Sequence, residues 1–168
     1  MAEMQRRLVA GLSAAGAVIV LDQLSKFWVV AGVRLPETPG RRIELSPVFD
    51  LTFVENRGVS FGLLQAGGMV ERWGLILLSL AISGFFLAWL RTAERRLTAL
   101  ALGLVIGGAV GNVIDRLRFG YVVDFLDFSG LWFPWVFNVA DAAITIGAAL
   151  LMLDYLVAGE ARAKAETP

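Results

Sequence analysis

Two aspartates in the second half of the chain are the residues best suited to acid–base chemistry. Asp124 and Asp141 lie in the segments YVVDFLDF and FNVADAAI, where apolar residues flank each one and no basic residue is its neighbour. Two carboxyl groups brought together cannot easily both ionise, so the pair shares a proton. The ionised member can take a proton from water as it attacks a carbonyl, and the protonated member can donate to the carbonyl oxygen and then to the leaving amine. The two residues therefore predict a hydrolytic site.

The composition excludes several other kinds of chemistry. The 168 residues include no cysteine and no histidine, which removes disulfides, thiol nucleophiles, zinc sites built on these residues and imidazole-based triads. We therefore expect neither a cofactor nor a metal site. The formal net charge is zero, and the basic residues are scattered without interleaved aromatic residues, so no nucleic-acid partner is expected.

The elements that position the two aspartates are predicted to be membrane helices. The chain is 57% hydrophobic, only 18% charged and has a mean hydropathy of +0.69, which is typical of a membrane protein. A helix needs about 20 mostly apolar residues to cross the bilayer. Four segments qualify, at about 8–30, 73–90, 97–114 and 135–157. We expect an all-α membrane protein in which residues 1–168 form a single integral membrane domain.

The connection between the first two spans, about 31–72, is predicted to hold a small extracytoplasmic β element. Pro36, Pro39 and Gly40 interrupt helical structure, and residues 43–56 are rich in β-branched and aromatic residues. The segment 61–73 is predicted to form a surface helix. A polar C-terminal tail, 159–168, is expected to be disordered.

Four spans place both termini on one side of the membrane and gather the polar residues on the other. The end of the first span, the start of the second, the end of the third and the start of the fourth must share one face. The polar residues predicted at that face are Asp22, Lys26, Asn56, Asn112, Asp115, Arg116, Asp124, Asn138 and Asp141. We therefore expect the chemistry at one face only.

Two tryptophans predict how deep the acids lie. Trp28 and Trp135 suit the membrane interface, and each is six residues from an acid, Asp22 or Asp141. A helical rise of about 1.5 Å per residue puts each acid about 9 Å below these anchors. An ionisable group at that depth is costly unless it is paired or hydrated, which favours a functional site.

Several of these residues also have structural interpretations that the sequence leaves open. Asp22 and Lys26 are spaced i, i+4 and can form a self-neutralising helix pair. Asp115 and Arg116 can anchor the end of a span or orient other groups. The three asparagines suit turns or helix caps: Asn56, Asn112 and Asn138. Small residues recur every fourth position at Ala99, Gly103, Gly107 and Gly111, a pattern that favours close packing against a neighbouring helix over substrate contact.

Four segments together resemble the motifs of the lipoprotein signal peptidase family, also called signal peptidase II. They are DQLSK (22–26), ENRGVSFG (55–62), GGAVGNVIDRLRFGYVVDF (107–125) and FNVADAAI (137–144), and they occur in this order. They are distributed over the whole chain except the termini, the proline-rich loop and the second span. One departure is visible, because Ser60 stands where the family often has alanine.

The resemblance implies an aspartyl endopeptidase of the bacterial inner membrane. Its substrates would be prolipoproteins, cut on the N-terminal side of a diacylglyceryl-modified cysteine, and its other contacts would be membrane lipids. Asp124 and Asp141 match the family's catalytic aspartates, and the first motif, with Asp22 and Lys26, has an organising role. Positions that frame the substrate or support the pair are matched by Asn56, Gly108, Asn112, Arg116 and Asn138. A β-cradle and a surface helix are implied as well, and we expect a monomer.

Three other functions fit the sequence less well. A transporter or proton channel predicts polar residues across the whole bilayer, whereas the other halves of the later spans are almost purely apolar. A metal-dependent lipid-headgroup transferase needs further upstream aspartates, which are missing. A serine protease using Ser25 and Lys26 is disfavoured because adjacent helix residues point about 100° apart. Ser60 with Lys26 remains open.

The distribution of positive charge gives a weak orientation. With Lys26 left aside, the other 14 of the 15 basic residues divide equally between the two faces. The face near the termini carries its arginines in short segments beside the spans: Arg6, Arg7, Arg91, Arg95 and Arg96. Because such segments are typical of the cytoplasmic side, we expect cytoplasmic termini and an active site near the periplasmic face.

Overall fold

The structure, a computed structural model, describes residues 1–58 and 68–166, with side chains to residue 157. Within these ranges the chain forms four long helices: α1 (Ala2–Phe27), α2 (Met69–Arg91), α3 (Arg96–Phe119) and α4 (Val139–Glu166). Each contains a stretch that is long and apolar enough to cross a membrane. The predicted four-helix membrane architecture is therefore confirmed.

Helix α3 is the centre of the bundle and contacts each of the other three helices. Most of its membrane-length segment is buried, whereas the corresponding segments of α1, α2 and α4 are mostly exposed. The exposed side chains on these outer helices include large apolar ones, such as Leu21, Leu77 and Met152. Lipid rather than water suits such surfaces.

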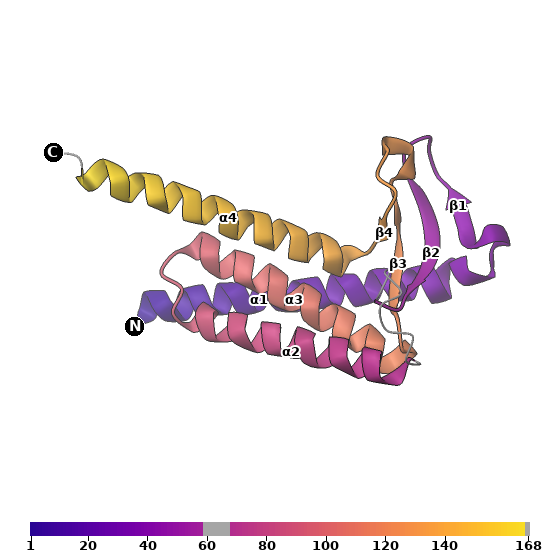
Figure 1. Cartoon of the computed structure of the whole chain (residues 1–168), viewed down its shortest axis with the longest axis horizontal. Helices are drawn as coiled ribbons and strands as arrows, with labels where there is room; N and C mark the ends of the chain where they lie inside the picture. The colour runs from indigo at the N-terminus through magenta and orange to yellow at the C-terminus, as the bar shows by residue number, and fades with distance from the viewer. Residues whose placement is uncertain (59–67, 167–168) are drawn as a thin grey trace.

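A small antiparallel sheet stands at one end of the helices, and both termini lie at the other end (Figure 1). Its order is β1 (Arg42–Glu44), β2 (Asp50–Asn56), β3 (Val122–Asp127) and β4 (Val136–Phe137). The predicted β element is confirmed, but half of its strands come from the chain after α3. An apolar cluster joins β2 and β3 to the segment that follows α1: Val29, Leu35, Leu51, Phe53, Val123 and Phe125.

Three expectations about the elements need correction or lie outside the described residues. The polar tail, 159–168, was expected to be disordered, but α4 continues to Glu166, because this segment consists largely of good helix formers such as alanine and glutamate. The fourth span was expected from 135, but α4 begins at Val139, because the preceding Val136 and Phe137 pair with β3. Trp135 is therefore not on that helix. The estimate that Asp141 lies about 9 Å below Trp135 assumed a continuous helix between them and does not apply. The surface helix was expected over 61–73. Residues 59–67 lie outside the described ranges, and Met69 to Trp73 belong to the start of α2.

The small-residue stripe of α3 allows α1 to approach closely. A Cβ atom at Gly103 would overlap the backbone carbonyl of Gly11, and one at Gly107 would lie 2.6 Å from the carbonyl oxygen of Ala15. In both cases the added carbon atom would be closer to a backbone oxygen than a normal carbon–oxygen contact allows. The packing role predicted for this stripe is confirmed at these two positions.

Gly103→Ala should destabilise the protein, because the added methyl group forces α1 and α3 apart. Overpacking of this kind costs about 1–3 kcal/mol. The matched control is Gly84→Ala in α2, where a Cβ would have no neighbour within 4 Å. In thermal unfolding in detergent, Gly103→Ala should lower the midpoint and Gly84→Ala should leave it unchanged or raise it slightly. Equal effects of the two substitutions would contradict this account of the packing.

Candidate active site

Asp124 lies in β3, directly after the turn that ends α3. Gly120 has a φ of 85°, a left-handed conformation that stops the helix and redirects the chain into the strand. The Asp124 side chain is 1% exposed. One carboxylate oxygen accepts a hydrogen bond from Asn56 Nδ2 at 2.9 Å and the other from Asn138 Nδ2 at 2.6 Å. Two amide donors therefore hold this buried carboxyl group in place.

Asp141 lies in the first turn of α4 and is only partly buried. Asn138 precedes the helix, and its Oδ1 accepts the backbone N–H of Asp141 at 2.9 Å, as an N-cap residue does. The Asp141 side chain accepts a hydrogen bond from Asn112 Nδ2 of α3 at 2.8 Å. This aspartate is thus fixed at both its backbone and its carboxylate.

Two asparagines link the two aspartates. Asn138 donates both to Asp124 and, at 3.3 Å, to Asn112 Oδ1, while Asn112 donates to Asp141. The predicted pair is thereby brought into one hydrogen-bond network from β3, α3 and α4. Arg116, one turn beyond Asn112, is close enough to interact electrostatically with both aspartates. Asn138 caps α4 and also donates a hydrogen bond to Asp124, so the structural and the functional interpretation of this residue are compatible.

The environment of Asp124 makes its carboxyl group easier to protonate than a free one. Burial raises the pKa of this carboxyl group to about 6, and the nearby charge of Asp141 also raises it, although the hydrogen bonds from Asn56 and Asn138 act in the opposite direction. Asp141 faces more solvent. Two carboxyl groups in such different surroundings suit a division into proton donor and proton acceptor.

A buried ion triad lies next to the two aspartates. Lys26 Nζ is 2.9 Å from a carboxylate oxygen of Asp22 and 2.8 Å from one of Asp115. All three side chains are almost fully buried, with exposed fractions of 4% or less. The self-neutralising helix pair predicted for Asp22 and Lys26 is present, and Asp115 of α3 extends it to a second helix.

The triad also holds the backbone that carries the aspartates. Asp22 Oδ1 accepts the N–H of Ala140, directly before Asp141. Asp115 Oδ2 accepts the N–H of Val123, directly before Asp124. Both bonds are 3.0 Å long. The sequence placed Asp22 and Asp115 only in the same region as the site. The structure shows that each accepts a hydrogen bond from the residue directly before one aspartate of the pair.

Gln23 is a member of this network that sequence reasoning did not identify. Its Nε2 lies 2.9 Å from Asp115 Oδ1 and 3.1 Å from Asp22 Oδ2, so it bridges the two acids of the triad. The sequence feature that could have identified it is its position in DQLSK, directly after Asp22 in a mostly apolar segment. Gly108 has a different role, because a Cβ there would overlap the carbonyl oxygen of Ala140, so it allows α3 and α4 to meet at the site.

A mostly apolar groove of about 320 Å³ opens beside Asp141. Its lining residues come from the β4 region and the first two turns of α4: Phe133, Phe137, Asp141, Ala142, Thr145 and Ile146. Asp141 is the charged group in this lining. An apolar ligand in the groove would therefore meet the more exposed of the two aspartates.

The serine alternatives gain no support from the described residues. The Ser25 hydroxyl donates to the backbone carbonyl of Asp22 at 2.8 Å. Lys26 Nζ is held between the carboxylates of Asp22 and Asp115. Ser60 lies outside the described residues.

Comparison with known proteins places the chain beside a group of bacterial enzymes. A family model described as signal peptidase (SPase) II matches residues 14–157. The lipoprotein signal peptidase of Caulobacter vibrioides is 45% identical over 154 residues, which cover 91% of this chain and 90% of the relative. That of Rhizorhabdus wittichii is 47% identical over 158 residues, covering 93% and 91%. A solved bacterial membrane enzyme has a TM-score of 0.74 at 27% identity, covering 87% of this chain and 92% of that one.

Proposed function

Because this chain belongs to the signal peptidase II family of proteases and is a multi-pass membrane protein, we propose that it removes signal peptides from prolipoproteins. The cut falls on the N-terminal side of a diacylglyceryl-modified cysteine. The observation that carries the catalytic assignment is the network in which Asn138 and Asn112 join Asp124 to Asp141. The protein is thus proposed to be an aspartic endopeptidase that needs no cofactor.

The proposed mechanism divides the work between the two aspartates. Ionised Asp141, the more exposed of the two, takes a proton from a water molecule as its oxygen attacks the scissile carbonyl carbon. Protonated Asp124 donates a hydrogen bond to the carbonyl oxygen and supplies a proton as the tetrahedral intermediate forms. When that intermediate breaks down, Asp141 passes the proton it took from water to the leaving amine of the cysteine, Asp124 regains a proton from a hydroxyl group of the intermediate, and the pair returns to its singly protonated state. Asn56, Asn112 and Asn138 position the carboxyl groups, while Arg116 offsets their negative charge.

The position of the site at one end of the bundle suits a lipid-anchored substrate. The acyl chains of the modified cysteine lie in the hydrocarbon region, so its scissile bond is held near the headgroup boundary. The apolar groove beside Asp141 offers a surface for the apolar part of such a substrate. We place the site at the periplasmic face of the inner membrane, with cytoplasmic termini, in a chain that works as one monomeric unit surrounded by membrane lipids.

Cleavage of one prolipoprotein with and without its diacylglyceryl group tests the proposed substrate class. The purified enzyme in detergent should cut the lipidated form at the bond before the modified cysteine and leave the unlipidated form essentially intact. Mass spectrometry of both products identifies the bond. Equal cleavage of both forms would mean that the protein does not select its substrate by the lipid.

The pH dependence of cleavage should report the proton on Asp124. With the pKa of Asp124 raised to about 6 by burial, the proton needed for donation is lost as pH rises through that value, so kcat/KM should fall above about pH 6. Asn56→Ala removes a hydrogen bond that lowers the pKa of Asp124. This variant should therefore shift the alkaline limb of the profile to higher pH.

Thr52→Val is the matched control for this profile. It removes a hydrogen bond from the same strand to a different carboxylate, the 2.6 Å contact with Asp127. Its alkaline limb should coincide with that of the wild type. A limb that stays in place in Asn56→Ala, or moves equally in both variants, would rule out Asp124 as the group that titrates.

A further inference from the structure

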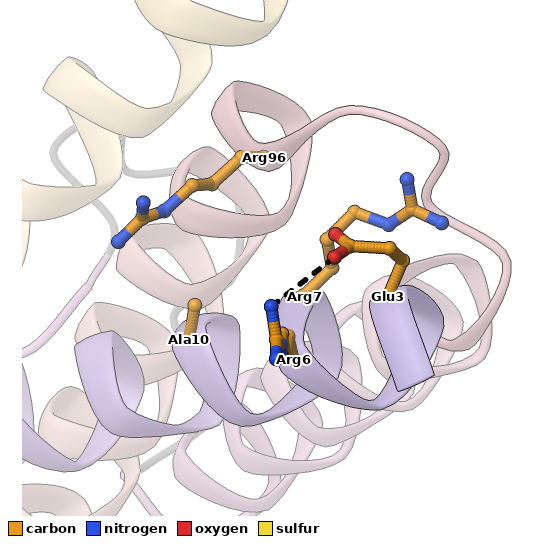
Figure 2. A pocket seen from close by; sticks show the side chains of 5 residues that line it. All are labelled: Glu3, Arg6, Arg7, Ala10 and Arg96. Atoms are coloured by element: carbon orange, nitrogen blue, oxygen red, sulfur yellow. Dashed lines mark hydrogen bonds and ion pairs between the residues drawn. The ribbon is translucent and has the colours of Figure 1, made fainter. Parts of the chain in front are cut away.

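A second concave region lies at the opposite end of the bundle, where the termini emerge. A pocket of about 420 Å³ is lined by Glu3, Arg6, Arg7 and Ala10 of α1 and by Arg96 of α3. Figure 2 shows Arg96 extending from the first turn of α3 while Arg6 extends from α1, with the small side chain of Ala10 between them. Asp22 is 15 residues beyond Arg7 on the same helix, or about 22 Å along its axis. The pocket is therefore separate from the proposed active site.

The lining has an excess of positive charge. Among the side chains that the structure describes, the one carboxylate of this lining is Glu3, which lies 3.3 Å from Arg6 and offsets one of the three guanidinium groups. Arg7 Nη1 donates to the backbone carbonyl of Glu94, which contributes no full charge. Arg96 has no ion pair among residues 1–58 and 68–157. Guanidinium groups bind phosphate through paired N–H donors, so the lining suits a phosphate group.

The surroundings of the pocket indicate where that phosphate comes from. Along the same part of α1, Val9 is 61% exposed and Leu12 is 46% exposed. These side chains suit contact with acyl chains, and Arg6 and Arg7 lie at the end of the same membrane helix. Charged side chains at the end of a span meet the phosphate layer of the bilayer.

We propose that this pocket binds the phosphodiester headgroup of an anionic phospholipid, with Arg96 as its main phosphate contact and Arg6, which is paired with Glu3, as a weaker second contact. The acyl chains lie against the exposed apolar side chains of α1. The lipid thereby bridges the first turns of α1 and α3 at the face opposite the aspartates. A zwitterionic phospholipid fits less well, because its own cationic group opposes the charge of the arginines.

Native mass spectrometry of the purified full-length protein tests this site. The protein is equilibrated with mixed micelles that contain phosphatidylglycerol and phosphatidylcholine, and the retained lipids are counted. Arg96→Gln should reduce the preference for phosphatidylglycerol about fivefold, the effect of one basic residue at a membrane surface. Arg91→Gln is the matched control: Arg91 is an exposed arginine at the same end of the bundle, outside the lining. Its preference should stay close to that of the wild type.

Two further measurements complete the test. Arg6→Gln is a second variant with a smaller expected loss, because Glu3 already pairs with Arg6, and thermal unfolding checks that each variant is folded. Free glycerol 3-phosphate, added in excess, should not displace the retained lipid. Equal losses in Arg96→Gln and Arg91→Gln would show diffuse surface attraction in place of a pocket. Displacement by glycerol phosphate, or no lipid preference in the wild type, would also overturn the proposal.

Discussion

Asp141→Asn and Asp124→Asn should each lower the rate of prolipoprotein cleavage by about 10²- to 10⁴-fold, the contribution of a positioned acid or base. An amide at position 141 cannot take a proton from water. At position 124 it can fill the space of the carboxyl group, but it cannot supply the proton to the carbonyl oxygen as the tetrahedral intermediate forms. Single-turnover cleavage of the lipidated substrate in detergent measures both effects without interference from product release.

Asp127→Asn is the control for these two variants. Asp127 is a further buried aspartate of β3, but its partners are Thr52, Ser129 and Arg42, outside the network of the pair. The same substitution there should leave cleavage within a few-fold of the wild type once the folded fraction is matched. Near-normal cleavage by either variant of the pair would remove the basis for an aspartic mechanism, and Ser60 with Lys26 would become the site to test.

Lys26→Met should destabilise the protein more than any single change to a surface ion pair. It leaves Asp22 and Asp115 buried without their cation, and removal of one partner from such a group costs about 3–5 kcal/mol. The thermal unfolding midpoint in detergent should fall by on the order of 10 °C. Since both acids bond to the backbone beside an aspartate of the pair, activity should also fall.

Two comparisons separate burial of charge from other effects of Lys26→Met. Arg34→Met breaks an exposed ion pair with Glu37 and should change stability little, since such pairs contribute about 0–1 kcal/mol. Asp22→Asn in the Lys26→Met background removes one of the uncompensated charges and should recover part of the lost stability. A wild-type unfolding midpoint for Lys26→Met would show that the triad does not hold this end of the bundle.

The helices could be predicted because their physical cause is visible in the sequence. A span needs a long apolar stretch, and this chain has four of them separated by polar segments. Counting spans then placed Asp22, Asp115 and Asp141 at one end of the bundle, where the structure has them. The glycine spacing in α3 likewise indicated a close helix contact, because only small residues let two backbones approach.

The strands after α3 could not be predicted in the same way. β3 is buried along almost all of its length, so Val122 to Asp127 show no alternation of polar and apolar residues. β4 has only two residues and depends on its pairing with β3. Because the sequence does not reveal these strands, it predicts a helix that begins at Trp135. The incorrect depth of Asp141 follows from that prediction.

Long-range bonds of the site also lay beyond the sequence. The i, i+4 spacing of Asp22 and Lys26 predicted their pair, but not the bond from Asp22 to the N–H of Ala140, 118 residues away. Such contacts depend on how α1 and α4 approach each other across α3. The sequence could therefore identify which residues are polar at this end of the bundle, but not which residue each one supports.

The most direct test of the central claim is whether Asp124 and Asp141 act as one catalytic unit. Single-turnover cleavage rates of the wild type, Asp124→Asn, Asp141→Asn and the double variant provide the comparison, with folding of each checked by thermal unfolding. If the two aspartates share the proton transfers of one reaction, the double variant should be about as slow as the slower single variant, because residues of one catalytic unit are strongly non-additive. Losses that multiply in the double variant, or a single variant that retains wild-type cleavage, would contradict the account.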